Sequence, residues 1–120
     1  MQSIANLKEL LTHMQPELNP GRYAFVALPS GFALAPALIV ASVREPEGLS
    51  VILPEQAAHD FGLPIAFTAA WITLTVHSNL ATIGLTAAFS QALGQAGISC
   101  NVVAGVHHDH LFVPVEIGRA

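Results

Sequence analysis

Four consecutive residues near the end of the chain carry side chains that could bind a metal ion: His107, His108, Asp109 and His110. Imidazole and carboxylate groups are ligands for zinc, nickel and copper. On an extended segment His108 and His110 share one face, and a third ligand would have to come from His59 or His77. The spacing matches no established metal motif. The structural alternative, which we favour, is a polar hairpin whose histidines hydrogen-bond locally and respond to pH.

A second candidate site is a loop that leads from a predicted strand into a predicted helix. It consists of His77, Ser78, Asn79, Leu80, Ala81, Thr82, Ile83 and Gly84. The unpaired N–H groups and partial positive charge at a helix N-terminus suit a carboxylate. Ser78 and Asn79 add polar groups, and Gly84 lets a ligand approach the backbone. The alternative is that the polar residues only form the turn and cap the helix.

The remaining residues of chemical interest give no support for catalysis. Glu45 and Glu47 are paired carboxylates, but Pro46 and Gly48 indicate a solvated turn with no nucleophile nearby. A single cysteine, Cys100, excludes an internal disulfide and a cysteine-based zinc site, and we expect it to face the core. No Ser-His-Asp order, P-loop or dinucleotide-binding motif occurs. We therefore expect neither enzyme activity nor a cofactor.

The composition indicates a compact cytoplasmic domain with more apolar surface than its interior can hold. Of the 120 residues, 52% are hydrophobic and only 10% are charged. The net charge is −4 and the basic residues are scattered, which argues against nucleic-acid binding. The longest weakly polar run, Phe32 to Val43, falls short of the roughly 20 residues that cross a bilayer. Because a small domain buries limited apolar surface, we expect a homo-oligomer.

These candidate residues must be positioned by a mixture of strands and helices. In the first half the patterns predict a helix over 4–15, a turn at 19–21, strands over 22–28, 37–43 and 49–53, and a helix from 54 that ends at Gly62. The strand over 37–43 is almost wholly apolar, which is typical of a strand buried on both faces. Residues 63–70 are predicted to connect the two halves.

The second half is predicted to have the element order β-α-β-β. Its first strand covers 71–76, with Ile72, Leu74 and Val76 on the opposite face from Trp71. A helix over 83–96 follows, with Gly97 as its C-terminal cap. Strands over 98–105 and 110–115 then form a hairpin.

The second half resembles the ACT domain, a ferredoxin-like βαββαβ unit that usually binds amino acids or other small effectors. The resemblance rests on the strand ITLTV and on the run GLTAAFSQALGQAGISCNVV. The phrases HSNLAxxGLTAA and HDHLFVP, with NPGRYxF and RExEGLSVILP in the first half, are similar to a group of small tandem ACT proteins of uncharacterised function.

The resemblance implies an α+β fold of two ferredoxin-like lobes in tandem, residues 1–64 and 65–120, with antiparallel sheets and helices on one face. It also implies that the effector binds at the loop over 77–84, near an interface between lobes. An ACT lobe would continue past Val115 into a second helix, so we expect that helix to be absent or reduced to a turn. A partner chain would then cover one sheet face.

We expect a non-catalytic regulatory module that binds a small molecule, an amino acid or a similar small acid. One alternative is a metal-binding protein or metal-dependent enzyme that uses the turn over 107–110. Another is a purely structural subunit of an oligomer.

Overall fold

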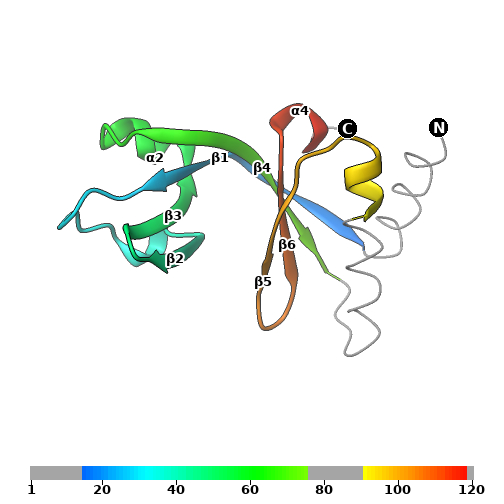
Figure 1. The fold of residues 1–120 in the computed structure, drawn as a ribbon, viewed down its shortest axis with the longest axis horizontal. Coiled ribbons are helices and arrows are strands. Elements are labelled where there is room, and N and C mark those ends of the chain that lie inside the picture. Colours follow the sequence, from blue (N-terminus) through cyan, green and yellow to red (C-terminus); the bar gives the residue numbers. More distant parts are fainter. Residues whose placement is uncertain (1–14, 76–90, 119–120) are drawn as a thin grey trace.

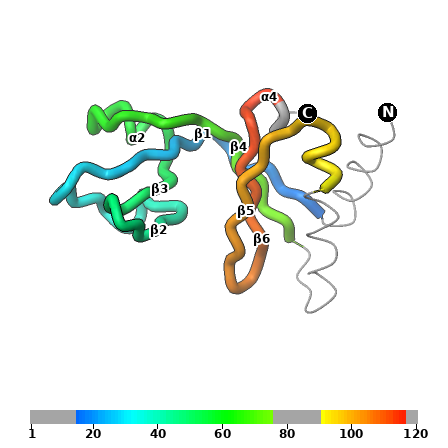
Figure 2. The backbone as a smooth tube through the Cα atoms, viewed as in Figure 1, coloured from blue at the N-terminus to red at the C-terminus, as the bar shows by residue number. Residues whose placement is uncertain are grey.

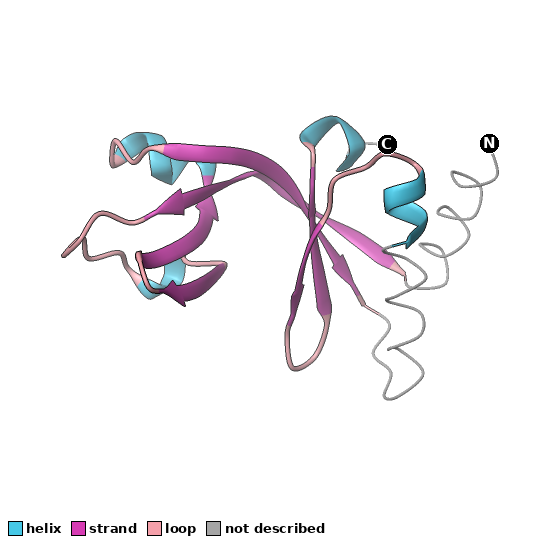
Figure 3. Ribbon diagram, in the orientation of Figure 1, coloured by secondary structure: helices cyan, strands magenta, loops and turns pink. Residues whose placement is uncertain are grey.

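The computed structural model describes residues 15–75 and 91–118. Figures 1 and 3 show its helices and strands. They are β1 (Pro16–Ala27), the 3-10 turn η1 (Pro36–Leu38), β2 (Ala41–Glu45), β3 (Gly48–Pro54), α2 (Glu55–Asp60), β4 (Ile65–Leu74), β5 (Asn101–Ala104), β6 (Asp109–Val113) and α4 (Val115–Gly118). Residues 91–95 are also helical.

All six strands form one antiparallel sheet in the order β2-β3-β1-β4-β6-β5. In a ferredoxin-like unit the first strand lies between the third and the fourth, and the second lies at an edge. The strands β2-β3-β1-β4 have this order, so the predicted ferredoxin-like α+β class is confirmed. Between β1 and β2 the chain makes only the turn η1 where a full helix is usual.

The strands β1 and β4 run through the whole sheet and hold its two ends together. Pro16–Asn19 pairs with Trp71–Leu74, and Tyr23–Val26 pairs with the first half of β4. The register shifts between Asn19 and Tyr23, where four residue steps of β1 lie against two of β4. Gly21 has φ +90° within this irregularity. The sheet therefore continues through a bulge rather than ending there.

Two predictions are wrong at this place, for the same physical reason. The residues at 19–21 were predicted to form a turn, and the residues at 63–70 to be a connection, but most of both lie in strands. Proline and glycine are turn signals locally, yet a bulge accepts both because it leaves backbone groups unpaired. The two segments become strands because β1 pairs with β4, which lies about fifty residues away in the chain, and a local sequence pattern does not show this pairing.

The predicted strand over 37–43 is also wrong in place and in burial. Pro36 starts the turn η1, and β2 begins only at Ala41. This strand is the edge of the sheet, and Ser42 to Glu45 are exposed. The hairpin turn is shorter than predicted, because Glu45 pairs directly with Gly48. The apolar side chains before β2 instead pack as a loop, with Ile39 and Val40 half-buried.

The predicted cap at Gly97 is confirmed, and Gly62, where the first-half helix was predicted to end, has the same geometry. The N–H of Gly62 donates to the carbonyl of His59, and the next N–H, of Leu63, donates to that of Ala58. Gly97 closes the helical residues 91–95 in the same way, and the two glycines have φ +66° and +73°. This arrangement is the Schellman motif, which requires the left-handed conformation at the glycine. After β6 the described chain forms one helical turn, α4, from Val115 to Gly118.

The helix α2 and the helical residues 91–95 pack on one face of the sheet, which we call the helical face. The residues of α2 cover a cluster centred on Val51 and Leu53, and residues 92 and 93 cover Leu74 and Leu111. Ile72 and Leu74 lie on this face and Trp71 on the other, as predicted for the described part of that strand.

Cys100 packs at the edge of the helical-face core. It contacts the cluster around Leu74 and Leu111, and burial raises the pKa of its thiol to about 11. The thiol is therefore a small apolar group rather than a reactive thiolate. Within residues 15–75 and 91–118, none of the helices has the length and apolar composition of a membrane span.

Candidate functional site

The face of the sheet opposite the helical face carries a cluster of aromatic rings. By the alternation of strand side chains, β1, β4 and β6 contribute Tyr23, Phe25, Phe67, Trp71 and Phe112. Phe25 stacks on Phe67 with ring centroids 4.2 Å apart and meets Phe112 edge-on at 5.6 Å. Trp71 meets Tyr23 edge-on at 5.2 Å. We call this side the aromatic face, and neither α2 nor the helical residues 91–95 belong to its cluster.

The aromatic face is buried by the curvature of the sheet itself. Phe112 is only 1% exposed and Ile52 only 6%. Ala41 from the edge strand β2 and Val103 from the opposite edge strand β5 pack against the same cluster. The twist that accumulates over six strands thus brings the two edges toward each other. The two edge hairpins, β2–β3 and β5–β6, can be followed in Figure 2.

Between the two edges lies a hollow of about 390 Å³, which we call the edge groove. Residues 41–43 of β2 and residues 101–103 of β5 form its opposite walls, and β1, β3 and β4 form its floor. None of the described residues that line it carries a charge, although the lining Ser50 donates a hydrogen bond to the Glu45 carboxylate. Val43, Phe67 and Val102, which are 59%, 47% and 40% exposed, all border it. The groove therefore offers apolar surface to solvent in a concave shape, which is the usual form of a small-molecule site.

A polar network lies on the aromatic face where β4 pairs with β6, beside a small hollow of about 50 Å³. The indole N–H of Trp71 donates to Nδ1 of His110 at 3.1 Å, and the Thr73 hydroxyl lies 3.3 Å from the same nitrogen. The side-chain amide of Asn19 donates to Thr73 Oγ1 at 2.9 Å. Because Nδ1 accepts, the neutral imidazole carries its proton on Nε2.

Burial lowers the pKa of His110, and the nearby His108 lowers it further, while Asp109 acts in the opposite direction. The imidazole is therefore neutral at pH 7. Protonation of Nδ1 would place a donor opposite the Trp71 donor, so the hydrogen bond itself selects the neutral form. His110 is consequently a structural residue that holds β4 and β6 together on the aromatic face.

The metal-site alternative gains no support in the described part of the chain. No group of three or more His, Cys, Asp or Glu side chains suited to a metal occurs there. Nδ1 of His110 is occupied by Trp71, and Nδ1 of His108 is buried without a hydrogen-bond partner. His59, one proposed third ligand, lies on α2 at the helical face, where it contacts Glu55. The other, His77, lies outside the described residues.

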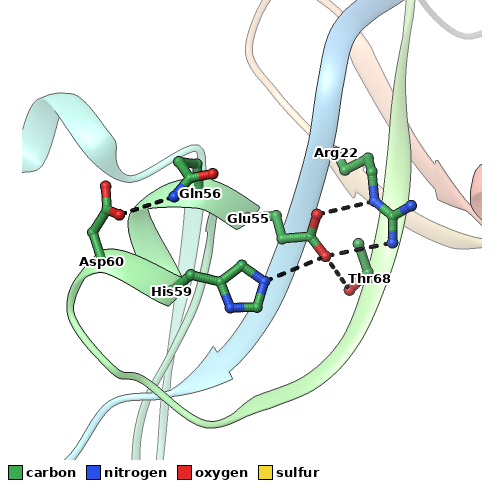
Figure 4. A network of polar contacts seen from close by, with 6 residues as sticks. All are labelled: Arg22, Glu55, Gln56, His59, Asp60 and Thr68. Atoms are coloured by element: carbon green, nitrogen blue, oxygen red, sulfur yellow. Dashed lines mark hydrogen bonds and ion pairs between the residues drawn. The ribbon is translucent and has the colours of Figure 1, made fainter.

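A second polar network fastens α2 to the helical face (Figure 4). Both carboxylate oxygens of Glu55 contact the Arg22 guanidinium, at 3.0 and 3.4 Å. The Thr68 hydroxyl donates to Glu55 at 3.4 Å, and His59 lies 3.8 Å from the same oxygen. These residues join β1, α2 and β4, and Glu55 occupies the first helical turn, where the helix dipole favours a negative charge. The arrangement is an ion pair that orients a short helix.

The predicted effector loop over 77–84 lies outside the described residues. The last described residue before this loop is Thr75, directly after β4. The N–H and the hydroxyl of Thr75 donate to the carbonyl of Gln15 at 3.2 and 2.7 Å. The edge groove borders Ala66 and Phe67 near the start of β4, whereas the sequence reaches residues 77–84 only after β4 has ended at Leu74. From Phe67 to Thr75 there are eight residue steps, or about 26 Å of extended strand.

The edge groove was not found from the sequence, although part of its signal is visible there. Tyr23 and Phe25 alternate with Ala24 and Val26, which is typical of a strand with one aromatic face. Phe67 was missed because residues 63–70 were interpreted as a connection. The approach of β2 to β5 leaves no local pattern at all.

Comparison with known proteins decides the family. One model of the ACT domain matches residues 2–70, and a second matches residues 67–116. The chain belongs to the ACT-domain family. The two matches lie in tandem and meet inside β4. ACT domains are in general non-catalytic, regulatory domains that bind small molecules.

A crystal structure from Vibrio cholerae, described as a protein of unknown function and a possible transport protein, is similar over nearly the whole chain. The identity is 43% and the TM-score is 0.78, with 98% of this chain and 91% of that chain covered. No curated protein matches the sequence. The similar structure therefore supports the fold, and its own function is open.

Proposed function

We propose that the protein is a regulatory module that holds an amino acid or a similar small acid at the loop over 77–84. The observation that carries this proposal is the pair of ACT matches in tandem, which cover residues 2–116. A zwitterionic amino acid needs partners for both of its charges. The edge groove has no charged lining, so the helix N-terminus predicted at 77–84 is the better site for such a ligand.

We also propose that the chain forms two ferredoxin-like lobes, residues 1–64 and 65–120, coupled through β1 and β4. Pro16–Asn19 lies beside Trp71–Leu74. This is the position that the fourth strand of the C-terminal lobe would take beside its own first strand. Its partner there would thus come from the N-terminal half of the chain, whereas the sequence suggested that a neighbouring chain completes this lobe.

This coupling gives a route for regulation. Effector binding at the end of β4 would favour one arrangement of the 77–84 loop and of the Gln15 contact beside it. Because β1 and β4 cross both halves of the sheet, the shift in population would reach the N-terminal lobe. The apolar composition still predicts a homo-oligomer, and the expected location is the cytoplasm.

Thermal unfolding with each of the twenty amino acids at millimolar concentration tests the proposed function. An amino acid present at 100 times its dissociation constant should stabilise the fold by about 2.7 kcal/mol. Asn79→Ala should abolish that shift, whereas Asn101→Ala, an exposed asparagine on β5, should keep it. An unchanged melting temperature with all twenty, or equal shifts in the two variants, would contradict the proposal.

A further inference from the structure

We propose that the edge groove is a second binding site, for a small uncharged aromatic molecule. Nothing in the amino-acid-binding role requires this site, which borders Phe67 near the start of β4, whereas the predicted effector loop follows the end of β4 in the sequence. The proposal rests on the size of the hollow, on the exposed ring at its floor and on the lack of charge in its walls.

The size of the groove suits a small molecule. Its volume of about 390 Å³ equals the space of about 13 waters at about 30 Å³ each, so it admits a ligand of roughly a dozen non-hydrogen atoms. A further hollow of about 440 Å³ borders the same Phe67 and Asn101, on the side where β6 has ended. Phe67 thus stands between two hollows with its ring accessible.

The floor of the groove is built for an aromatic ring. Phe67 rests on Phe25 in a stacked arrangement, with an angle of 21° between the planes, and Phe25 rests edge-on against the buried Phe112. This packing fixes one face of the Phe67 ring, while 47% of the residue stays exposed. A third ring stacked on the exposed face would extend the same offset arrangement, which is favourable for aromatic pairs.

The walls exclude a charged ligand. Val43 faces solvent at the rim, and the polar residues of the described lining are Ser42, Ser50 and Asn101, which carry no charge. A carboxylate would lose hydration there and would lie near the Glu45 carboxylate, which accepts a hydrogen bond from the Ser50 hydroxyl. An ammonium would exchange its hydration for that one carboxylate, which already has Ser50 as a partner. One hydroxyl or N–H on the ligand can still be satisfied by the amide of Asn101, which pairs with Phe112 and so lies on the aromatic face. The ligand class is therefore an uncharged aromatic with one hydrogen-bonding group.

A small molecule fits the groove better than a protein partner does. The apolar surface is concave and lies between two strand edges, whereas a stable protein interface needs about 800 Å² of complementary surface on each side. The exposed apolar residues at the rim form a narrow border around the hollow. A flat second copy would contact that border and leave the hollow empty, which forfeits the packing contacts inside it.

Fluorescence titration with 2-naphthol tests the site, with 2-naphthoate as the charged molecule of matched ring size. We expect saturable 2-naphthol binding with one site per chain, and binding of 2-naphthoate at least about tenfold weaker. Phe67→Ala should weaken 2-naphthol binding about tenfold. Phe61→Ala is the matched control, because Phe61 is 49% exposed but lies at the end of α2, and it should leave the affinity unchanged.

Amide chemical shifts of the unaltered protein provide a measurement that depends on no variant. Addition of 2-naphthol should shift the amides of residues 41–43 and 101–103. Shifts confined to other segments would overturn the proposal, as would the absence of saturable binding. Equal affinity for 2-naphthoate, or equal losses in Phe61→Ala and Phe67→Ala, would also overturn it. If light scattering shows a dimer that only Phe67→Ala dissociates, the occupant is a second copy and the small-molecule proposal fails.

Discussion

The two faces of the sheet bury their apolar side chains in different ways. On the helical face, α2 and residues 91–95 lie over Leu53 and Leu111, and each of these helical segments ends in a glycine cap. On the aromatic face, the edges of the same sheet approach each other over Phe112. Local elements cover the core of the first face, whereas curvature buries the centre of the second and leaves a groove at its rim. A binding surface can therefore arise from sheet twist alone.

The largest expected loss of stability comes from a substitution that leaves a cavity in the core of the aromatic face. Phe112→Ala should reduce the free energy of unfolding by about 3–5 kcal/mol, because the ring is 1% exposed and supports Phe25 and Trp71. Leu53→Ala on the helical face should cost about 2–5 kcal/mol. Urea unfolding measures both. A loss below about 1 kcal/mol for Phe112→Ala would mean that curvature does not form a true core.

A smaller effect concerns the glycine caps of the helical face. Gly62→Ala should cost about 1–2 kcal/mol, because φ is +66° and an added Cβ would meet open space, so that only backbone strain acts. Gly94→Ala is the control within the helical residues 91–95, and it should stabilise by about 0.5–1 kcal/mol. Equal effects of the two substitutions in thermal unfolding would show that the Schellman geometry does not constrain Gly62.

The next effect is pH-dependent and belongs to the aromatic face. The pKa of His110 is lowered in the folded protein, so the unfolded state binds its proton first as the pH falls. Stability should be complete above about pH 6.5 and should decrease as the pH drops through the lowered pKa. His110→Gln should remove this part of the pH dependence in urea unfolding, and His107→Gln should retain it. A profile that does not change in His110→Gln would contradict the role of the Trp71 hydrogen bond.

The smallest effect concerns the ion pair on the helical face. Arg22→Ala should cost only about 0.2–1 kcal/mol, since the Arg22 side chain is 47% exposed and water screens its contact with Glu55. The loss should shrink further at high salt. Urea unfolding at low and high salt measures this loss. A loss of unfolding free energy above about 2 kcal/mol that salt does not reduce would contradict the prediction, because it would mean that the Arg22–Glu55 pair is screened from water.

The sequence contains the local part of this fold and lacks the long-range part. Gly97 could be predicted as a cap because it follows an apolar helical pattern directly, and Gly62 could be predicted as the end of its helix. The opposite faces of Trp71 and Leu74 follow from alternation alone. The continuation of β1 through Pro20 and of β4 through Phe67 depends on pairing between distant residues, which no local window contains.

The same division applies to the candidate sites. The loop over 77–84 was identified from polar residues before a helix, and it stays a prediction because it lies outside the described residues. The edge groove needed the three-dimensional sheet, since β2 and β5 are about sixty residues apart in the chain and approach each other only through accumulated twist. Its apolar walls also resemble ordinary strand residues, so their composition gives no functional signal.

The central claim is that the protein has two separate small-molecule sites, one near the start of β4 and one in the loop that follows its end. The most direct test is a melting experiment with the best amino acid and with 2-naphthol, in the unaltered protein, in Asn79→Ala and in Phe67→Ala. We predict that Asn79→Ala loses only the amino-acid shift and that Phe67→Ala loses only the 2-naphthol shift. A variant that loses both shifts, or two variants that lose neither, would contradict the claim.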